Sequence, residues 1–286
     1  MKSKLLRTTL LIIVIIGICI PAYQWNHSNI VRLRNAGKTR MAPIIMVPGS
    51  SATKNRFDNL ISELGHEAPQ QHSVLKVVVK TDGKIETTGS IARNDQQPFI
   101  VVSFQNNKDG KKNIDLQSNW LNLAFKELVK TYHFNHFSAL GHSNGGLILT
   151  LFLEKYLKES PTVSIDKLMT IATPYNMEEE NLKKKTAMFN ELYKYRDGLP
   201  KSLVMYSIAG TENYNSDGTV PYNSVNFAKY IFQDNVKNFT EITVTGANTA
   251  HSDLPQNKQI VALIGQYILR ENFKPSQIQG NNKNNN

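Results

Sequence analysis

The stretch His136-Phe-Ser-Ala-Leu-Gly-His-Ser-Asn-Gly-Gly146 decides how this chain folds. Its first half is apolar and reads as a buried strand, and residues 147–157 continue it with the apolar spacing of a helix. Gly141 and Gly145 stand two residues on either side of Ser143, as in a sharp strand-to-helix turn where a side chain at either position would collide with the backbone. The stretch therefore predicts a strand, a tight turn with Ser143 at its apex, and a helix. An incidental serine in a glycine-rich turn is the less supported alternative.

Composition favours one folded domain and argues against two function classes. The chain has 286 residues, of which 40% are apolar, which is enough for one sizeable core. Its net charge is +10, but lysine and arginine are scattered and no basic-aromatic recognition motif occurs, so we expect no nucleic-acid partner. The single cysteine, Cys19, lies in the N-terminal apolar segment, which excludes a disulfide framework and a cysteine-ligated metal site in the folded part.

The N-terminus has the pattern of an export signal, a membrane anchor, or both. Three basic residues occur within the first seven, and residues 8–20 are almost continuously apolar. The basic flank favours a cytoplasmic N-terminus with the rest of the chain outside the membrane, anchored or secreted. We therefore divide this part into a signal or anchor segment, residues 1–22, and a basic tether, residues 23–40. Lipidation at Cys19 is disfavoured because Ile18 is bulky where a small residue is needed.

The remaining chain alternates short apolar runs with helical patterns, which predicts a mostly parallel sheet covered by helices on both faces. Asp82-Gly83 is a hairpin signal, so one antiparallel ribbon is expected within that sheet. We assign an α/β domain to residues 41–273, with a charged helical cap or a simple surface helix at about 175–200, and a disordered polar tail to residues 274–286. The predicted strands are residues 43–47, 74–80, 84–88, 99–104, 137–140, 167–172, 202–209 and 241–245, and the predicted helices are residues 59–64, 116–132, 147–157 and 258–269.

A serine hydroxyl needs a base to take its proton, and the base needs a carboxylate to orient it. In this kind of turn the acid and the histidine follow the serine in that order. Asp217 lies in a turn beyond a predicted strand, and His251 lies between the last predicted strand and the last predicted helix. Asp197 precedes its strand and better suits a turn, and Asp253, too near His251 to orient it, is expected to cap the final helix.

Two backbone N–H groups are expected to bind the developing oxyanion. One belongs to Asn144, directly after the serine, and the other to the loop after the first strand, where Pro48-Gly49 permits close approach. Ser50 is the preferred donor in that loop and Ser51 the alternative. A strand-to-helix turn without any catalytic role is also compatible with this segment. His142 adjoins Ser143, but neighbouring side chains at such a turn point apart, so we expect it to pack rather than react.

These motifs together resemble the α/β-hydrolase superfamily. Ser143 stands in Gly-His-Ser-Asn-Gly-Gly, Asp217 in Ser-Asp-Gly-Thr-Val-Pro and His251 in Gly-x-x-x-x-His-Ser-Asp-Leu-Pro. More narrowly, the chain is similar over about residues 43–269 to an uncharacterised branch of membrane-bound or cell-surface hydrolases of Gram-positive bacteria, which share the hairpin at 75–89 and the helix containing Trp120.

The resemblance implies a doubly wound α/β-hydrolase fold, a triad of Ser143, Asp217 and His251, and no cofactor or metal. One departure concerns the oxyanion loop, since many relatives have His-Gly where this chain has Pro48-Gly49. The expected function is a serine esterase or lipase-like hydrolase outside the cytoplasmic membrane, acting on a small-molecule or lipid-like ester. The alternative is a non-catalytic ligand-binding protein on the same scaffold. The sequence leaves the acyl group and the oligomeric state open.

Overall fold

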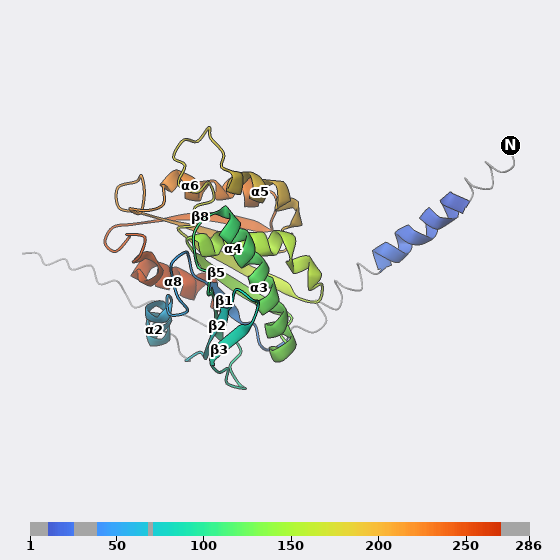
Figure 1. Ribbon diagram of the computed structural model, residues 1–286, viewed down its shortest axis with the longest axis horizontal. Helices are drawn as coiled ribbons and strands as arrows, with labels where there is room; N and C mark the ends of the chain where they lie inside the picture. The colour runs from blue at the N-terminus through green and yellow to red at the C-terminus, as the bar shows by residue number, and fades with distance from the viewer. Residues whose placement is uncertain (1–10, 26–38, 68–70, 270–286) are drawn as a thin grey trace, which may run out of the picture.

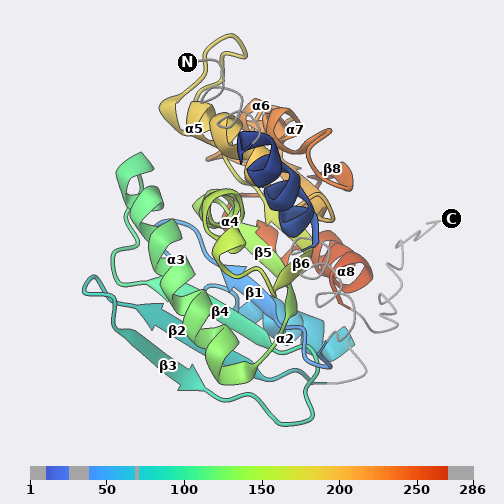
Figure 2. The ribbon, with the colours of Figure 1, turned by 90° about the vertical axis from the view of Figure 1, so that its right-hand side faces the viewer.

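The computed structural model describes residues 11–25, 39–67 and 71–269. Its centre is one eight-stranded sheet in the order β3-β2-β4-β1-β5-β6-β7-β8, in which only the β2–β3 pair is antiparallel (Figure 1). β3 and β8 form its two edges (Figure 2). The strands are β1 (Ile44–Val47), β2 (Val74–Val79), β3 (Ile85–Gly89), β4 (Phe99–Phe104), β5 (His136–His142), β6 (Ser164–Ile171), β7 (Val204–Thr211) and β8 (Asn238–Thr245).

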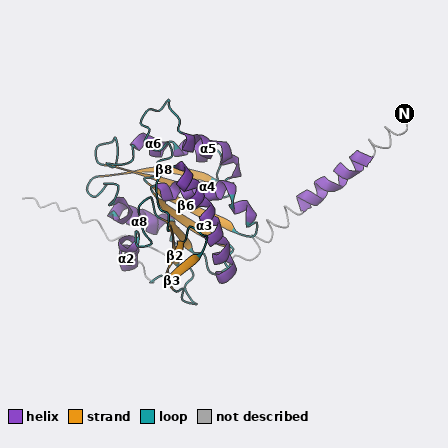
Figure 3. Cartoon of the chain, viewed as in Figure 1, coloured by secondary structure: helices purple, strands orange, loops and turns teal. Residues whose placement is uncertain are grey.

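Helices cover both faces of the sheet (Figure 3). α3, α4, α5 and α7 contribute to the larger apolar cluster on one face, while α2 and α8 contribute to a second cluster on the other. The central strands β1, β4 and β5 are therefore buried along their whole length, which explains why they read as continuous apolar runs. The helices are α2 (Asp58–Glu67), α3 (Lys111–Tyr132), α4 (Asn144–Lys155), α5 (Ala187–Tyr195), α6 (Tyr222–Asn226), α7 (Ala228–Phe232) and α8 (Lys258–Tyr267).

Three local features differ from the sequence-based expectation. α3 begins at Lys111 rather than residue 116. The sequence pattern missed this start because the first turn of the helix is polar and follows Gly110, which has a φ of 98°. The short helices α6 and α7 were not expected from the pattern. The cap of α8 is Asn257, whose side chain accepts the N–H of Gln259, so the expectation for Asp253 is wrong. An Asx side chain directly before the first helical residue satisfies an otherwise free N–H, and Asp253 lies too early to do this.

The predicted cap contains one helix and one loop. α5 buries Met188, Phe189 and Leu192 in the larger core cluster, so this helix is part of the covering layer of the sheet. The loop before it, residues 172–186, contains Met177, which has a φ of 54° and lines a cavity described below. A role of this loop as a lid over the site stays a prediction.

Residues 11–25 form a helix whose large apolar and aromatic side chains are all at least half exposed, from Ile16 at 50% to Tyr23 at 73%. Among the described residues, no helix combines the length and apolarity needed to cross a membrane. The first ten residues of the predicted signal or anchor, tether residues 26–38, the last four residues of the predicted domain, 270–273, and the whole predicted tail, 274–286, lie outside the described residues.

One carboxyl group is buried in α4 without a partner. Glu154 is 2% exposed, and neither of its side-chain oxygens has a hydrogen-bond partner in the described part of the chain. Burial raises the pKa of Glu154 well above its ordinary value, with Lys155 opposing the rise and Glu191 adding to it. The folded protein therefore holds a proton that the unfolded chain releases.

Glu154→Gln is expected to stabilise the fold increasingly as the pH rises. The unfolded chain ionises this carboxyl above about pH 4.3, so the wild type loses up to about 1.4 kcal/mol of stability per pH unit between that pH and the folded-state pKa. The glutamine variant does not titrate at this position, so it loses no stability from this cause. Urea unfolding at about pH 5 and about pH 8 should show a gap between variant and wild type that widens with pH. Glu127→Gln, which changes an exposed carboxyl of α3, is the control, and an equal gap at both pH values would contradict the expectation.

Candidate active site

The turn between β5 and α4 holds Ser143 in a strained backbone conformation. Ser143 has φ 54° and ψ −133°, a region that non-glycine residues rarely adopt. A Cβ added at Gly145 would lie 2.0 Å from the carbonyl oxygen of Val47, and one at Gly141 would lie 2.6 Å from the backbone nitrogen of Gly146. The two glycines are therefore required by close backbone approach, and the turn presents Ser143 at the carboxyl end of the central strand.

Asp217 and His251 are joined by two hydrogen bonds. The His251 Nδ1 lies 2.6 Å from Asp217 Oδ2, and the His251 backbone N–H donates to the Asp217 carbonyl at 2.8 Å. The other carboxylate oxygen, Oδ1, accepts the N–H groups of Thr219 and Val220 at 3.0 and 2.7 Å. The Asp217 side chain is 1% exposed, against 16% for His251. A buried carboxylate held by three hydrogen bonds keeps the proton on Nδ1, which leaves Nε2 of a neutral ring free to accept one.

Ser143 and His251 line the same cavity, whose volume is about 180 Å³. Its wall also includes Ser50 and Asn144 from the two loops expected to bind an oxyanion, together with Met177 from the loop before α5. Within the described residues, no hydrogen bond joins Ser143 Oγ to the His251 ring, and catalytic contacts of this kind often tighten only when substrate is bound. The structure thus brings the predicted serine, acid, histidine and both oxyanion loops to one place.

The oxyanion loop distinguishes Ser50 from Ser51. The N–H of Ser51 donates to the carbonyl of Asn107 at 2.8 Å, so it is already occupied. Within the described part of the chain, the N–H of Ser50 has no such acceptor, and that of Asn144 is a free donor at the first position of α4. A Cβ at Gly49 would lie 2.6 Å from the Ser143 Cβ, which explains the need for glycine in this loop. The geometry favours Ser50 and Asn144 as donors.

His142 contacts the candidate base directly, which the sequence reasoning missed. Its side chain is buried, its ring centroid lies 4.7 Å from that of His251, and its Nε2–H donates to the His251 carbonyl at 3.0 Å. Burial holds the pKa of His142 well below its ordinary value, and the charges of His251 and Arg56 lower it further. His142 is thus a neutral group that packs, as expected, but also fixes the backbone of His251. The position of His142 directly before Ser143 was the sequence signal that could have indicated a role in the site.

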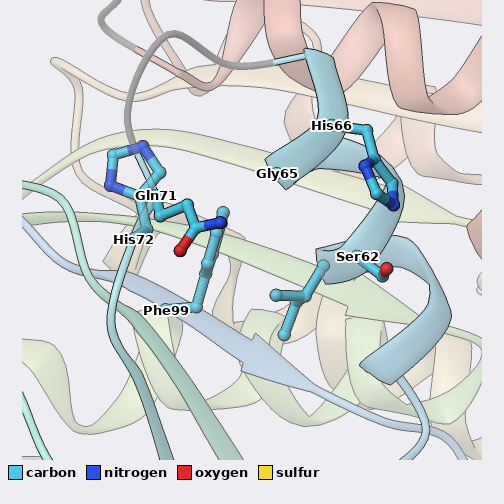
Figure 4. A pocket seen from close by; sticks show the side chains of 7 residues that line it. Ser62, Gly65, His66, Gln71, His72 and Phe99 are labelled. Atoms are coloured by element: carbon cyan, nitrogen blue, oxygen red, sulfur yellow. The ribbon is translucent and has the colours of Figure 1, made fainter.

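A second cavity, of about 230 Å³, contains two histidines but lies at the other end of the strands (Figure 4). His66 and His72 line it together with Phe99, the first residue of β4, and His72 Nδ1 lies 3.2 Å from Asp95. Parallel sheets bind ligands beyond the carboxyl ends of their strands, where Ser143 lies. Among the described residues, no group of three or more His, Cys, Asp or Glu is arranged to hold a metal ion.

The chain matches, over residues 33–271, a family described as alpha/beta hydrolases of unknown function, DUF915. The chain belongs to this α/β-hydrolase family. A protein of Lactobacillus plantarum WCFS1, provisionally named a cell surface hydrolase, is 74% identical, with a TM-score of 0.77 over 82% of this chain and 94% of that one. The lin2722 gene product of Listeria innocua is 25% identical, with a TM-score of 0.74 over 81% and 95% of the two chains. No curated protein matches.

Membership confirms the α/β-hydrolase fold expected from the strand-turn-helix around Ser143. The matched region of this family member contains every element of the sheet and the whole candidate site. The name of the Lactobacillus relative agrees with the expected cell-surface class of hydrolase. The roles of individual residues are not part of that agreement and rest on the geometry above.

Proposed function

We propose that this hydrolase cleaves esters through an acyl-enzyme formed on Ser143. The observation that carries the proposal is the convergence, in one cavity, of a serine at a strained turn and a histidine held by a buried carboxylate. A serine hydroxyl attacks a carbonyl only when a base removes its proton, and a histidine that keeps Nδ1–H toward a carboxylate supplies that base at Nε2.

In the proposed reaction, Ser143 Oγ attacks the ester carbonyl while His251 Nε2 accepts its proton. Asp217 stabilises the cationic ring, and the backbone N–H groups of Asn144 and Ser50 bind the oxyanion. Each such donor contributes roughly 3–4 kcal/mol to the transition state in comparable enzymes. His251 then gives its proton to the leaving alcohol, and water, activated by the same ring, releases the acyl group from Ser143. No cofactor enters any of these steps.

The proposed substrate is a small-molecule or lipid-like ester met outside the cytoplasmic membrane. The basic N-terminal flank and the exposed apolar helix at residues 11–25 support an N-terminal membrane attachment, and the name of the 74% identical relative supports a cell-surface location. A net charge of +10 supports attraction to an anionic wall or membrane. The cavity of about 180 Å³ is small, which favours short acyl groups.

A fluorophosphonate probe tests the activated serine without knowledge of the substrate. The purified protein is expected to react at one site, in the peptide that contains Ser143, because only a serine with an adjacent base is nucleophilic enough. His251→Ala should abolish the labelling while His66→Ala, which changes an exposed histidine of α2, should leave it intact. A folded wild-type protein that is not labelled, or is labelled elsewhere, would contradict the proposal.

A further inference from the structure

The side chain of Asn144 connects the oxyanion loop to the loop between β4 and α3. Its Nδ2 lies 2.7 Å from Ser50 Oγ and 2.7 Å from Asp109 Oδ1, and it donates to both. A primary amide has two N–H donors, so this pair of contacts uses both. All three residues line the cavity that contains Ser143. The residue directly after the serine is thus tied through its side chain to both loops.

A second pair of hydrogen bonds joins the same two loops at the residues that follow Ser50. Asn107 accepts the backbone N–H of Ser51 on its carbonyl at 2.8 Å, and its own Nδ2 donates to the carbonyl of Ala52 at 2.9 Å. These bonds hold the chain on the C-terminal side of Ser50 but do not reach Ser50 itself. The side-chain hydrogen bond from Asn144 does reach Ser50.

Side chains of α3 fix the loop that carries Asp109 through hydrogen bonds to its backbone. Gln117, which is 2% exposed, donates from Nε2 to the carbonyls of Asn106 and Lys108 at 2.8 and 3.1 Å. Asn113 donates to the carbonyl of Asp109 at 2.7 Å. These bonds fix the backbone that carries Asp109, so its carboxylate is a fixed acceptor for Asn144. On a flexible loop, an exposed carboxylate would sample many orientations.

We propose that Asp109 is a positioning residue for the oxyanion hole. Its carboxylate accepts a hydrogen bond from one amide N–H of Asn144, which directs the other amide N–H to Ser50 Oγ and holds the Ser50 backbone N–H at the oxyanion position. The inference rests on the proposed function and adds to it a residue that has no sequence motif. Because the oxyanion forms only in the transition state, losing this alignment should lower kcat rather than raise KM.

A different role is conceivable for the same carboxylate, namely attraction of a cationic substrate. The cavity wall contains a second exposed carboxylate, Glu178, which within the described residues makes no hydrogen bond to Asn144. Glu178→Ala removes a charge from the same wall and leaves the link intact, so it is the matched control for charge. Asp109→Asn removes the charge but keeps a side-chain oxygen that accepts from Asn144, so it separates the link from the charge.

The test is steady-state hydrolysis of p-nitrophenyl acetate, a neutral ester, by the wild type and the three variants. Asp109→Ala is expected to lower kcat by about 10- to 100-fold with KM within about twofold, the size of effect that a misplaced catalytic group produces. Asp109→Asn should keep kcat within about threefold of the wild type, and Glu178→Ala, which changes the same cavity wall but leaves the link intact, should lower kcat by less than Asp109→Ala does. Thermal unfolding verifies folding, and Asp109→Ser, too short to reach Asn144, repeats the test if the alanine variant is unstable.

Three outcomes would overturn the inference. An Asp109→Ala enzyme with wild-type kcat would show that the link does not affect the oxyanion hole. Equal losses in Asp109→Asn and Asp109→Ala, or an equal loss in Glu178→Ala, would show that charge is what matters. A wild-type protein that neither hydrolyses esters nor reacts with the fluorophosphonate would overturn the proposed function together with this inference, whereas an active wild type with a normal Asp109→Ala enzyme overturns this inference alone.

Discussion

Ser143→Ala is expected to lower kcat for ester hydrolysis by about 10⁶-fold, the cost of removing the nucleophile from comparable triads. The loss is this large because His251 and Asp217 act only through the serine, so no covalent intermediate can form without it. The backbone need not change, since alanine adds no atoms beyond the Cβ that Ser143 already places at a φ of 54°. Hydrolysis of short p-nitrophenyl esters by purified protein measures the effect.

The matched control for this variant is Ser252→Ala, which changes an exposed serine adjacent to His251. It should hydrolyse the same esters at the wild-type rate. The residual activity of Ser143→Ala should come only from binding and the oxyanion donors, at roughly 10³- to 10⁴-fold above the reaction in water. Undiminished turnover by a folded Ser143→Ala protein would rule out the acyl-enzyme mechanism.

Asp217→Asn is expected to lower kcat by about 10⁴-fold with little change in the fold. The asparagine amide would donate to His251 Nδ1, where the carboxylate now accepts at 2.6 Å, so the ring would carry its proton on Nε2 and could not act as the base. The amide oxygen can still accept the N–H groups of Thr219 and Val220, which preserves the turn. The same ester assay, with thermal unfolding alongside, measures the effect.

Asp197→Asn is the matched control for the acid. Asp197, like Asp253, was not expected to orient His251, and it lies in a short 3-10 turn, Arg196–Gly198, after α5. This variant should keep the wild-type kcat. A loss confined to Asp197→Asn, or equal losses in both variants, would show that Asp217 does not orient His251.

Most secondary structure could be predicted because its signals are local. The central strands are apolar throughout, since both faces of the sheet are covered, and Asp82-Gly83 lies in the turn of the β2–β3 hairpin with Gly83 at a φ of 85°. The errors are also explained locally. The first turn of α3 is polar and lacks a side-chain cap, and α6 and α7, with five residues each, are too short to show a helical period.

Contacts between segments distant in sequence could not be predicted from any local pattern in the chain. The sequence left Ser50 and Ser51 open, and the bond from Ser51 N–H to Asn107, 56 residues further along (107 minus 51), favours Ser50. The hydrogen bond from His142 to His251 joins residues 109 apart, and it gives a second role to a side chain expected only to pack. Nothing in the composition around these residues encodes such pairs.

By itself, the sequence determined the sharp turn at Ser143 and the order in which a serine, an acid and a histidine follow the ends of β5, β7 and β8. Glycine spacing and apolar runs suffice for this, because steric collision at a tight turn and burial of a strand act within a few residues. The tertiary structure decided which donors are free, how His251 is held, and that Asp109 meets Asn144 and Ser50. Those facts depend on hydrogen bonds that span 35 to 109 residues, which form only when the sheet brings the carboxyl ends of its strands together.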